Sequence, residues 1–316
     1  MSSTVASLLI NTLNRKDDLR IALKSVFEQT APLEVIVVDD GSTDGTSEMV
    51  RAEFPQVKLL RNEKPLGIIA ARNRAAHEAT HNIMFTLDDD ATFSSATTAE
   101  RVLKRFDHPR VGAVTLPLID HINGVAQKPS LPISEETPAD FPVTFSYTGG
   151  GNAKRRDLFL ALGGYGGVGR QGEESNYCIK MLSAGYIVRI ACAGWVNHYP
   201  IVKKRDENHI AYSGAMNRVI YTMQHVPFPH VITHMAGVLV NQVRVGFRDG
   251  RLKHCLRGVR DGWSWYQANK QVRKPTSPLV YRLSRVLVSG QAIPFSEIEK
   301  MLPPIKTVEE VQSSGS

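Results

Sequence analysis

The stretch Leu33-Glu34-Val35-Ile36-Val37-Val38-Asp39-Asp40-Gly41 decides the fold class of this 316-residue chain. It begins as a β-branched apolar run of strand length, and Asp39-Asp40-Gly41 is typical of the turn that ends a strand. A continuous apolar run predicts a strand that is buried on both faces, as in a parallel sheet covered by helices. The pattern recurs at Ile83 to Leu87, which runs into Asp88-Asp89-Asp90.

Segments with helical apolar spacing separate such strands throughout the first half of the chain. Strands are predicted at residues 5–10, 33–38, 57–60, 83–87 and 111–116, and helices at 17–29, 45–53, 68–79 and 97–106. This alternation predicts an α/β fold with a doubly wound, mostly parallel sheet and helices on both faces.

The second half is less regular. Five prolines between Leu116 and Pro142 predict a long excursion. A strand is then expected at 143–147, helices at 155–162 and 173–184, a last strand at 186–191, and helices from Glu207 onward. We therefore predict a sheet domain over residues 1–205, a helical C-terminal region over 206–306 and a disordered tail over 307–316.

Composition is that of a soluble globular protein, with 42% hydrophobic and 22% charged residues. The three cysteines are odd in number and lack CxxC spacing, which argues against a disulfide scaffold or structural zinc and suits a reducing cytoplasm. The N-terminal residues do not resemble a signal peptide. Polar residues interrupt the apolar stretch from Val231 to Phe247, which makes it a poor membrane span. We expect a cytoplasmic protein that does not cross a bilayer.

The net charge of +7 is concentrated near the C-terminus. Eleven Lys or Arg and two Asp lie between Arg244 and Arg285, a local charge of +9. Such a segment suits anionic lipid or a phosphorylated acceptor. A solvated helix face explains it equally well, and both interpretations stay open.

Two acidic clusters follow predicted strands, at the sheet edge where ligands gather in open parallel sheets. In Asp88-x-Asp90 the alternating carboxylates can share one side of an extended turn and bind a hard divalent cation. The alternative is that the aspartates, like Asp39 and Asp40, only close turns or cap helices.

Four motifs in order carry a family resemblance: Asn11-Thr12-Leu13-Asn14-Arg15, Val37 to Thr46 (VVDDGSTDGT), Gly67 to Asn73 (GIIAARN) and Leu87-Asp88-Asp89-Asp90. Together they cover most of residues 5 to 95 and resemble the family 2 glycosyltransferases with the GT-A fold. The chain lacks the Q-x-x-R-W motif and membrane helices of the processive members, so it is most similar to the bacterial-type, non-processive ones.

The resemblance implies a nucleotide site and a metal site. Asp40 would accept the N3–H of uracil or thymine, which would exclude cytosine. Asp88 would contact ribose. Asp89 would either line the nucleotide site or serve as a turn or helix cap. Asp90 would hold Mn²⁺ or Mg²⁺, with His198 as a further ligand or a merely structural histidine. The remaining implied nucleotide contacts are Thr12, Asn14, Arg15 and Arg72.

In the second half, Gly150, Gly151 and Asn152 resemble the family's glycine-rich stretch beside donor sugar and acceptor, although a flexible turn is the alternative. Gly172-Glu173-Glu174 stands where many relatives have Gly-Glu-Asp. Glu174 is the expected general base and Glu173 the reserve. Acidic residues also favour the first turn of a helix for electrostatic reasons.

The implied function is inverting transfer of one sugar from a UDP- or dTDP-linked donor to a hydroxyl of a glycan, lipid-linked or small-molecule acceptor, in glycan, glycolipid or polysaccharide biosynthesis. We expect no nucleic-acid partner, and the basic C-terminal helices suggest contact with the inner face of the membrane. The alternatives are a catalytically inactive nucleotide-sugar-binding protein and a sugar-nucleotide pyrophosphorylase, although Leu9 to Arg15 lacks the glycine-rich phosphate loop of the latter.

Residues 164–169 match the pattern G-x-G-x-x-G. The dinucleotide-binding fingerprint must follow a strand and open a helix. A helix is predicted before these residues, so the pattern does not indicate NAD binding.

Overall fold

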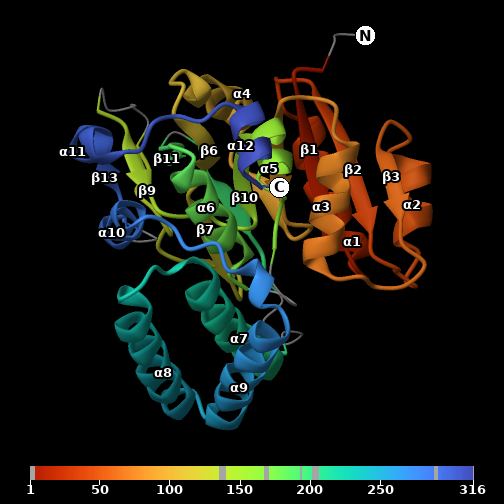
Figure 1. The fold of residues 1–316 in the computed structure, drawn as a ribbon. Coiled ribbons are helices and arrows are strands. Elements are labelled where there is room, and N and C mark those ends of the chain that lie inside the picture. The colour runs from red at the N-terminus through yellow and green to blue at the C-terminus, as the bar shows by residue number, and fades with distance from the viewer. Residues whose placement is uncertain are drawn as a thin grey trace.

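A 9-stranded sheet forms the centre of the protein (Figure 1), with strand order β13-β9-β11-β6-β10-β4-β1-β2-β3. The structure is a computed structural model that describes residues 4–134, 140–166, 171–192, 194–200, 206–287 and 291–315. The strands of this sheet are β1 (Ala6–Thr12), β2 (Leu33–Asp39), β3 (Lys58–Arg61), β4 (Ile83–Leu87), β6 (Val111–Thr115), β9 (Pro142–Thr144), β10 (Gly151–Arg155), β11 (Ile187–Ile190) and β13 (Ile293–Pro294). Strands β3, β2, β1 and β4 are mutually parallel, which confirms the predicted fold class.

Helices cover both faces of this sheet because successive strand residues point to opposite sides. Leu8 and Ile10 of β1 join the core that contains α1 and α2, whereas Leu9 joins the core that contains α3, α5 and α6. The helices of this part are α1 (Lys16–Phe27), α2 (Thr46–Glu53), α3 (Ile68–Glu78), α4 (Thr98–Leu103), α5 (Arg156–Ala161) and α6 (Glu173–Ser183).

Strand β10 lies antiparallel between β4 and β6, at a place where no strand was predicted. Its sequence, Gly-Asn-Ala-Lys-Arg, has no strand signature, yet Lys154 is buried. The Lys154 ammonium donates to Thr86 Oγ1 (2.9 Å) and Asn152 Oδ1 (2.6 Å), which satisfies the polar groups inside the sheet. Pairing of Gly151 with Leu87 brings the glycine-rich turn beside the aspartates that follow β4.

A second, 4-stranded sheet has the order β5-β12-β7-β8 and was not predicted. In its register His198 lies opposite Ala91 on one side and Asp120 on the other. The sheet therefore carries His198 to Asp90, the residue before Ala91. Its strands are β5 (Ala91–Phe93), β7 (Leu118–Ile122), β8 (Val125–Ala126) and β12 (Val196–His198).

Three long helices lie together below the sheet in Figure 1: α7 (Glu207–His225), α8 (His230–Arg248) and α9 (Leu252–Ala268). Helix α9 packs tightly on α7 through Gly258 and Gly262. A Cβ on Gly262 would lie 2.7 Å from the Met216 carbonyl oxygen. The predicted boundary between residues 205 and 206 adjoins residues 201–205, which lie outside the described residues. No helix among the described residues is long and apolar enough to span a membrane.

The end of the chain returns to the sheet, which differs from the predicted helical region and disordered tail. Strand β13 pairs with β9 at the sheet edge, and Leu283 and Phe295 join the core. The prediction of disorder is wrong for residues 308–315, which form a helix, because Val311 is buried in the core that contains α5. The elements concerned are α10 (Pro278–Val286), α11 (Phe295–Ile298) and α12 (Val308–Gly315).

Helix α5 ends at Ala161, so a helix precedes the G-x-G-x-x-G pattern at 164–169, as the argument against NAD binding requires. Residues 167–170 of that pattern lie outside the described residues.

Candidate active site

Asp88, Asp90 and His198 form a cluster in which one ligand atom of each lies within 4.8 Å of the others. His198 Nε2 is 3.2 Å from Asp90 Oδ1, and its Nδ1 is 2.5 Å from Asp120 Oδ1. Asp120 was not anticipated, because it lies in the proline-rich excursion and only the register of β7 with β12 brings it to His198. Asp120 orients the imidazole so that Nε2 faces Asp90.

Cationic side chains balance the acidic cluster. One Arg15 guanidinium nitrogen donates to Asp89 Oδ1 (3.0 Å) and Asp90 Oδ2 (2.6 Å). Burial raises the pKa of Asp89 to about 7, although Arg15 opposes this shift. Burial would also raise the pKa of Asp90, but His198 and Arg15 outweigh it and hold that pKa below its usual value. Asp90 is thus the buried carboxylate that stays ionised.

The donor set of the Asp88–Asp90–His198 cluster fits a divalent cation. Two carboxylates and an imidazole are a mixed oxygen and nitrogen set, which suits Mn²⁺ better than Mg²⁺. A carboxylate on the far nitrogen of a metal-binding histidine is the usual outer-shell partner, and Asp120 occupies that position. The residues predicted for the metal site, Asp90 and His198, are therefore together, and Asp88 joins them.

Arg72 of α3 connects this cluster to the start of α6. It is buried, and its Nη2 donates to Asp88 Oδ1 (3.0 Å) and to the Gly149 carbonyl oxygen (3.1 Å). Its Nη1 lies 3.3 Å from Glu174 Oε1 and 3.5 Å from Glu173 Oε1. One guanidinium thus contacts residues predicted for both the donor site and the base.

Glu173 and Glu174 begin helix α6. Burial and the charge of Glu173 raise the pKa of Glu174 to about 7, although Arg72 opposes this shift. Glu173 is more deeply buried, and its Oε2 has no hydrogen-bond partner among the described residues. Glu174 therefore has the titration range of a general base near neutral pH.

The turn at Gly149 and Gly150 requires glycine because the carboxylates of Glu174 and Asp88 lie where a Cβ would be. A Cβ on Gly149 would lie 2.5 Å from Glu174 Oε1, and one on Gly150 would overlap the Asp88 carboxylate. The predicted residues Gly151 and Asn152 lie deeper. Gly151 packs on Val196, and the Asn152 amide donates to the Thr148 and Gly149 carbonyl oxygens. Only Gly150 of the predicted trio borders a site carboxylate; the other two support the turn.

Asp40 ends β2 and anchors the segment before α3. Its Oδ1 accepts from the Asn62 amide (2.7 Å) and the Leu66 N–H (2.8 Å), and its Oδ2 accepts from the Gly67 N–H (2.8 Å). A carboxylate has about four acceptor positions. Among the described residues one position on Oδ2 is therefore left for a ligand.

Two other predicted nucleotide contacts, Asn14 and Thr12, form hydrogen bonds between the segments that follow β1 and β2. Asn14 accepts from the Thr43 N–H (2.7 Å), and its own N–H donates to Ser42 Oγ (2.9 Å). Thr12 is buried at the end of β1, where its carbonyl accepts from the Asp40 N–H (2.9 Å). Both residues hold the β1 and β2 ends together and so position Asp40.

The sheet and the carboxylates at its strand ends define a GT-A type of protein. A model of Glycosyl transferase family 2 matches residues 7–163. The chain belongs to the family 2 glycosyltransferases, as its motifs predicted.

Two similar proteins illustrate the match. Glycosyltransferase AglE of Haloferax volcanii is 33% identical over 100 residues, which cover 29% of this chain and 33% of that protein. The Escherichia coli protein UDP-Glc:alpha-D-GlcNAc-diphosphoundecaprenol beta-1,3-glucosyltransferase WfgD is 32% identical over 92 residues, which cover 28% of this chain and 36% of that protein. The match therefore spans only about a third of these relatives' own length.

Among solved structures, the mannosyltransferase PcManGT of Pyrobaculum calidifontis, in complex with GDP-Man and Mn²⁺, superposes with a TM-score of 0.56 at 19% identity. The superposition covers 93% of this chain and 86% of that one. The likeness confirms the GT-A fold over most of the chain.

Proposed function

We propose that the protein transfers one sugar from a nucleotide-diphosphate sugar to an acceptor hydroxyl, with inversion at the anomeric carbon. The observation that supports this most is the position of Arg72, whose guanidinium contacts Asp88 at the donor side and Glu174 at the acceptor side. A direct displacement needs the base and the departing diphosphate on opposite sides of one sugar, and Arg72 contacts the carboxylates proposed for these two sides.

Glu174 is the proposed base, which takes the proton of the acceptor hydroxyl as that oxygen attacks the anomeric carbon. The bond from this carbon to the diphosphate breaks as the new bond forms. Arg72 orients both carboxylates, and Gly150 lets the sugar approach Asp88. Asp88, Asp90 and His198 would hold Mn²⁺ or Mg²⁺, which neutralises charge on the leaving diphosphate when bound.

The free acceptor position on Asp40 Oδ2 suits a nucleobase with a ring N3–H donor, which uracil and thymine carry and cytosine lacks, and we propose UDP or dTDP donors. Guanine also presents N–H donors, and PcManGT was solved with GDP-Man. A thermal-shift screen of UDP, dTDP, CDP and GDP with Mn²⁺ tests the choice. A ligand at about 100 times its Kd stabilises by about 2.7 kcal/mol, which raises Tm by roughly 4 °C for a chain of this length. We expect this shift for UDP or dTDP and not for CDP; a CDP shift of equal size would contradict the role of Asp40.

The rival hypothesis is an inactive protein that keeps the fold for nucleotide-sugar binding. Donor hydrolysis that requires Mn²⁺ separates the two hypotheses, because a binding protein shows the thermal shift without turnover. The family match makes a pyrophosphorylase the weaker alternative.

We further propose that the protein contacts the inner face of the membrane through α8. Five large apolar side chains line one face of this helix and are exposed: Ile232 (61%), Leu239 (42%), Val240 (69%), Val243 (38%) and Phe247 (69%). They form what we call the α8 stripe. Arg244 and Arg248 are exposed on the same helix. An apolar stripe beside arginines suits an anionic lipid surface.

Replacing Val240 and Phe247 by Glu should weaken binding to anionic vesicles, because two apolar anchors become charged. We expect the affinity for phosphatidylcholine–phosphatidylglycerol vesicles, measured by co-sedimentation, to fall about tenfold or more. Ile21→Glu is the matched control, since Ile21 is 57% exposed on α1. Vesicle binding that does not depend on the phosphatidylglycerol content would contradict the proposal. Concentration-dependent dimerisation lost in the same variant would assign the stripe to a second copy instead.

A further inference from the structure

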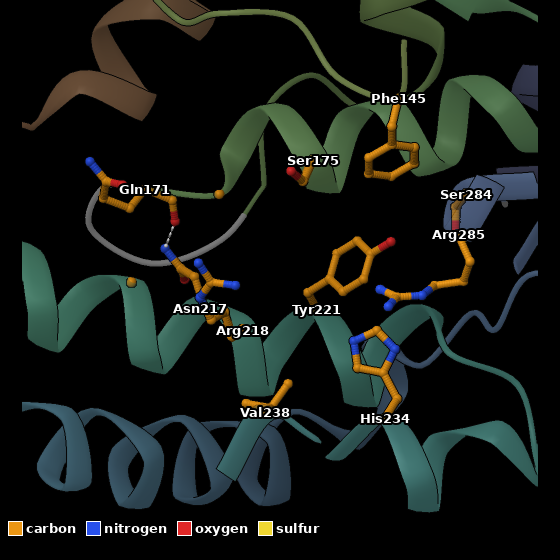
Figure 2. Close-up of a pocket in the computed structure, with 12 residues that line it drawn as sticks. Phe145, Gln171, Ser175, Asn217, Arg218, Tyr221, His234, Val238, Ser284 and Arg285 are labelled. Carbon is orange, nitrogen blue, oxygen red and sulfur yellow. Dashed lines mark hydrogen bonds between the residues drawn. The ribbon is translucent and has the colours of Figure 1, made fainter. Parts of the chain in front are cut away.

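A cavity of about 350 Å³ lies between the start of α6 and the C-terminal helices (Figure 2). Helices α6, α7, α8 and α10 all contribute to its wall, so it exists only because the chain returns from α9 to the sheet domain. Its size falls within the range of small-molecule sites, roughly 300–1,000 Å³. Its lining includes Ser175, Arg218, Tyr221, His234, Ser284 and Arg285.

The lining is positively charged. Arg218 of α7 and Arg285 of α10 both reach it, and the twelve lining residues include no Asp or Glu. Neither guanidinium has a hydrogen bond or ion pair with any residue in the described part of the chain, whereas Arg15 and Arg72 each form ion pairs with carboxylates. Two arginines that line one cavity without an acidic partner suit an anionic ligand.

Neutral groups in the cavity complete an anion site. The hydroxyls of Ser175, Ser284 and Tyr221 line it. Ser175 lies in the first turn of α6, where backbone N–H groups lack helical acceptors and the helix dipole favours negative charge. Burial and the charges of Arg285 and Arg218 hold the pKa of His234 below its usual value, so this ring remains neutral near pH 7.

We propose that this cavity binds a phosphate or diphosphate group of the acceptor. Gly172 and Ser175 both line the cavity and flank Glu174 in sequence, so the cavity adjoins the first turn of α6, which carries the proposed base. Arginines from two separate helices can each take different oxygens of one multiply charged group, which favours phosphate over a single carboxylate. This inference rests on the proposed function only in calling the ligand an acceptor.

Isothermal titration of the full chain with inorganic pyrophosphate tests the site. EDTA is included because Asp88 and Asp90 without a cation repel pyrophosphate, which leaves the cavity as the binding place. Arg285→Gln and Arg218→Gln should each weaken binding about tenfold, since each removes a charge-assisted contact. Arg101→Gln is the matched control, an exposed arginine of α4 outside the cavity lining, and should bind like the wild type. Equal affinity in all four proteins, or no binding to the wild type, would overturn the proposal.

Competition then distinguishes the source of the phosphate. A short prenyl diphosphate that binds more tightly than pyrophosphate indicates a lipid-linked acceptor, and a hexose 1-phosphate that does so indicates a soluble one. Binding of UDP with Mn²⁺ should be unchanged in Arg285→Gln. Mn²⁺-dependent donor hydrolysis without pyrophosphate binding refutes this inference alone, whereas pyrophosphate binding without hydrolysis refutes only the proposed function.

Discussion

Glu174→Gln should bind the nucleotide-sugar donor like the wild type and lose turnover by about 10²–10⁴-fold, the usual contribution of a general base. The substitution keeps the size of the side chain and an oxygen that can accept from Arg72, so the turn at Gly149 should survive. Turnover is measured as UDP or dTDP release with acceptor present, and donor binding by titration calorimetry.

Glu173→Gln is the matched control. Glu173 lies one residue away on the same helix and also faces Arg72, but it is more deeply buried. If Glu174 is the base, the Glu173 variant retains most of the activity. Turnover unchanged in Glu174→Gln, or lost only in Glu173→Gln, would transfer the role to Glu173.

The pH profile provides an independent check on the same residue. The pKa of Glu174 is raised to about 7 by burial and the charge of Glu173. A base works in its deprotonated form, so kcat/KM should rise with pH up to about 7 and level off above it. In Glu174→Gln the residual activity should lose this rise.

The sequence alone predicted the elements whose signal is local. Strands β1, β2 and β4 are continuous apolar runs that end in polar or acidic residues, and this pattern places Asp40 and Asp88 at one sheet edge. The family model and the solved structures confirm the family and the GT-A fold that these motifs predicted.

What the sequence could not predict depends on contacts between distant segments. Strand β10 has a polar sequence, and only its place between β4 and β6 makes it a strand. Asp120 belongs to no motif, and its contact with His198 arises from strand register. Gly149 belongs to the glycine-rich stretch, but its contact with Arg72 arises from the turn before β10. The final helix has a polar sequence, and its Val311 is buried in the core that contains α5.

Asp90→Asn should abolish detectable Mn²⁺ binding and reduce turnover by roughly 10³-fold or more. Charge stabilisation by a bound metal amounts to several kcal/mol, and each 1.36 kcal/mol is a factor of ten in rate. Asp90 is the buried carboxylate that stays ionised, so its loss removes the strongest ligand of the Asp88–Asp90–His198 cluster. Mn²⁺ binding is followed by the electron paramagnetic resonance signal of free Mn²⁺.

Variants of two further aspartates near this cluster test the same prediction. Asp120→Asn keeps every proposed ligand but loses the carboxylate that orients His198, so Mn²⁺ affinity should fall about 10–100-fold. Asp89→Asn should have the smallest effect, because Asp89 lies outside the ligand cluster and contacts Arg15. A metal site therefore predicts that the loss of Mn²⁺ affinity is largest for the Asp90 variant, smaller for the Asp120 variant and smallest for the Asp89 variant. A purely structural acidic turn held by Arg15 predicts equal effects of the Asp89 and Asp90 variants. Equal effects of the Asp89 and Asp90 variants, with Mn²⁺ binding intact in both, would show that Arg15 rather than a cation balances this cluster.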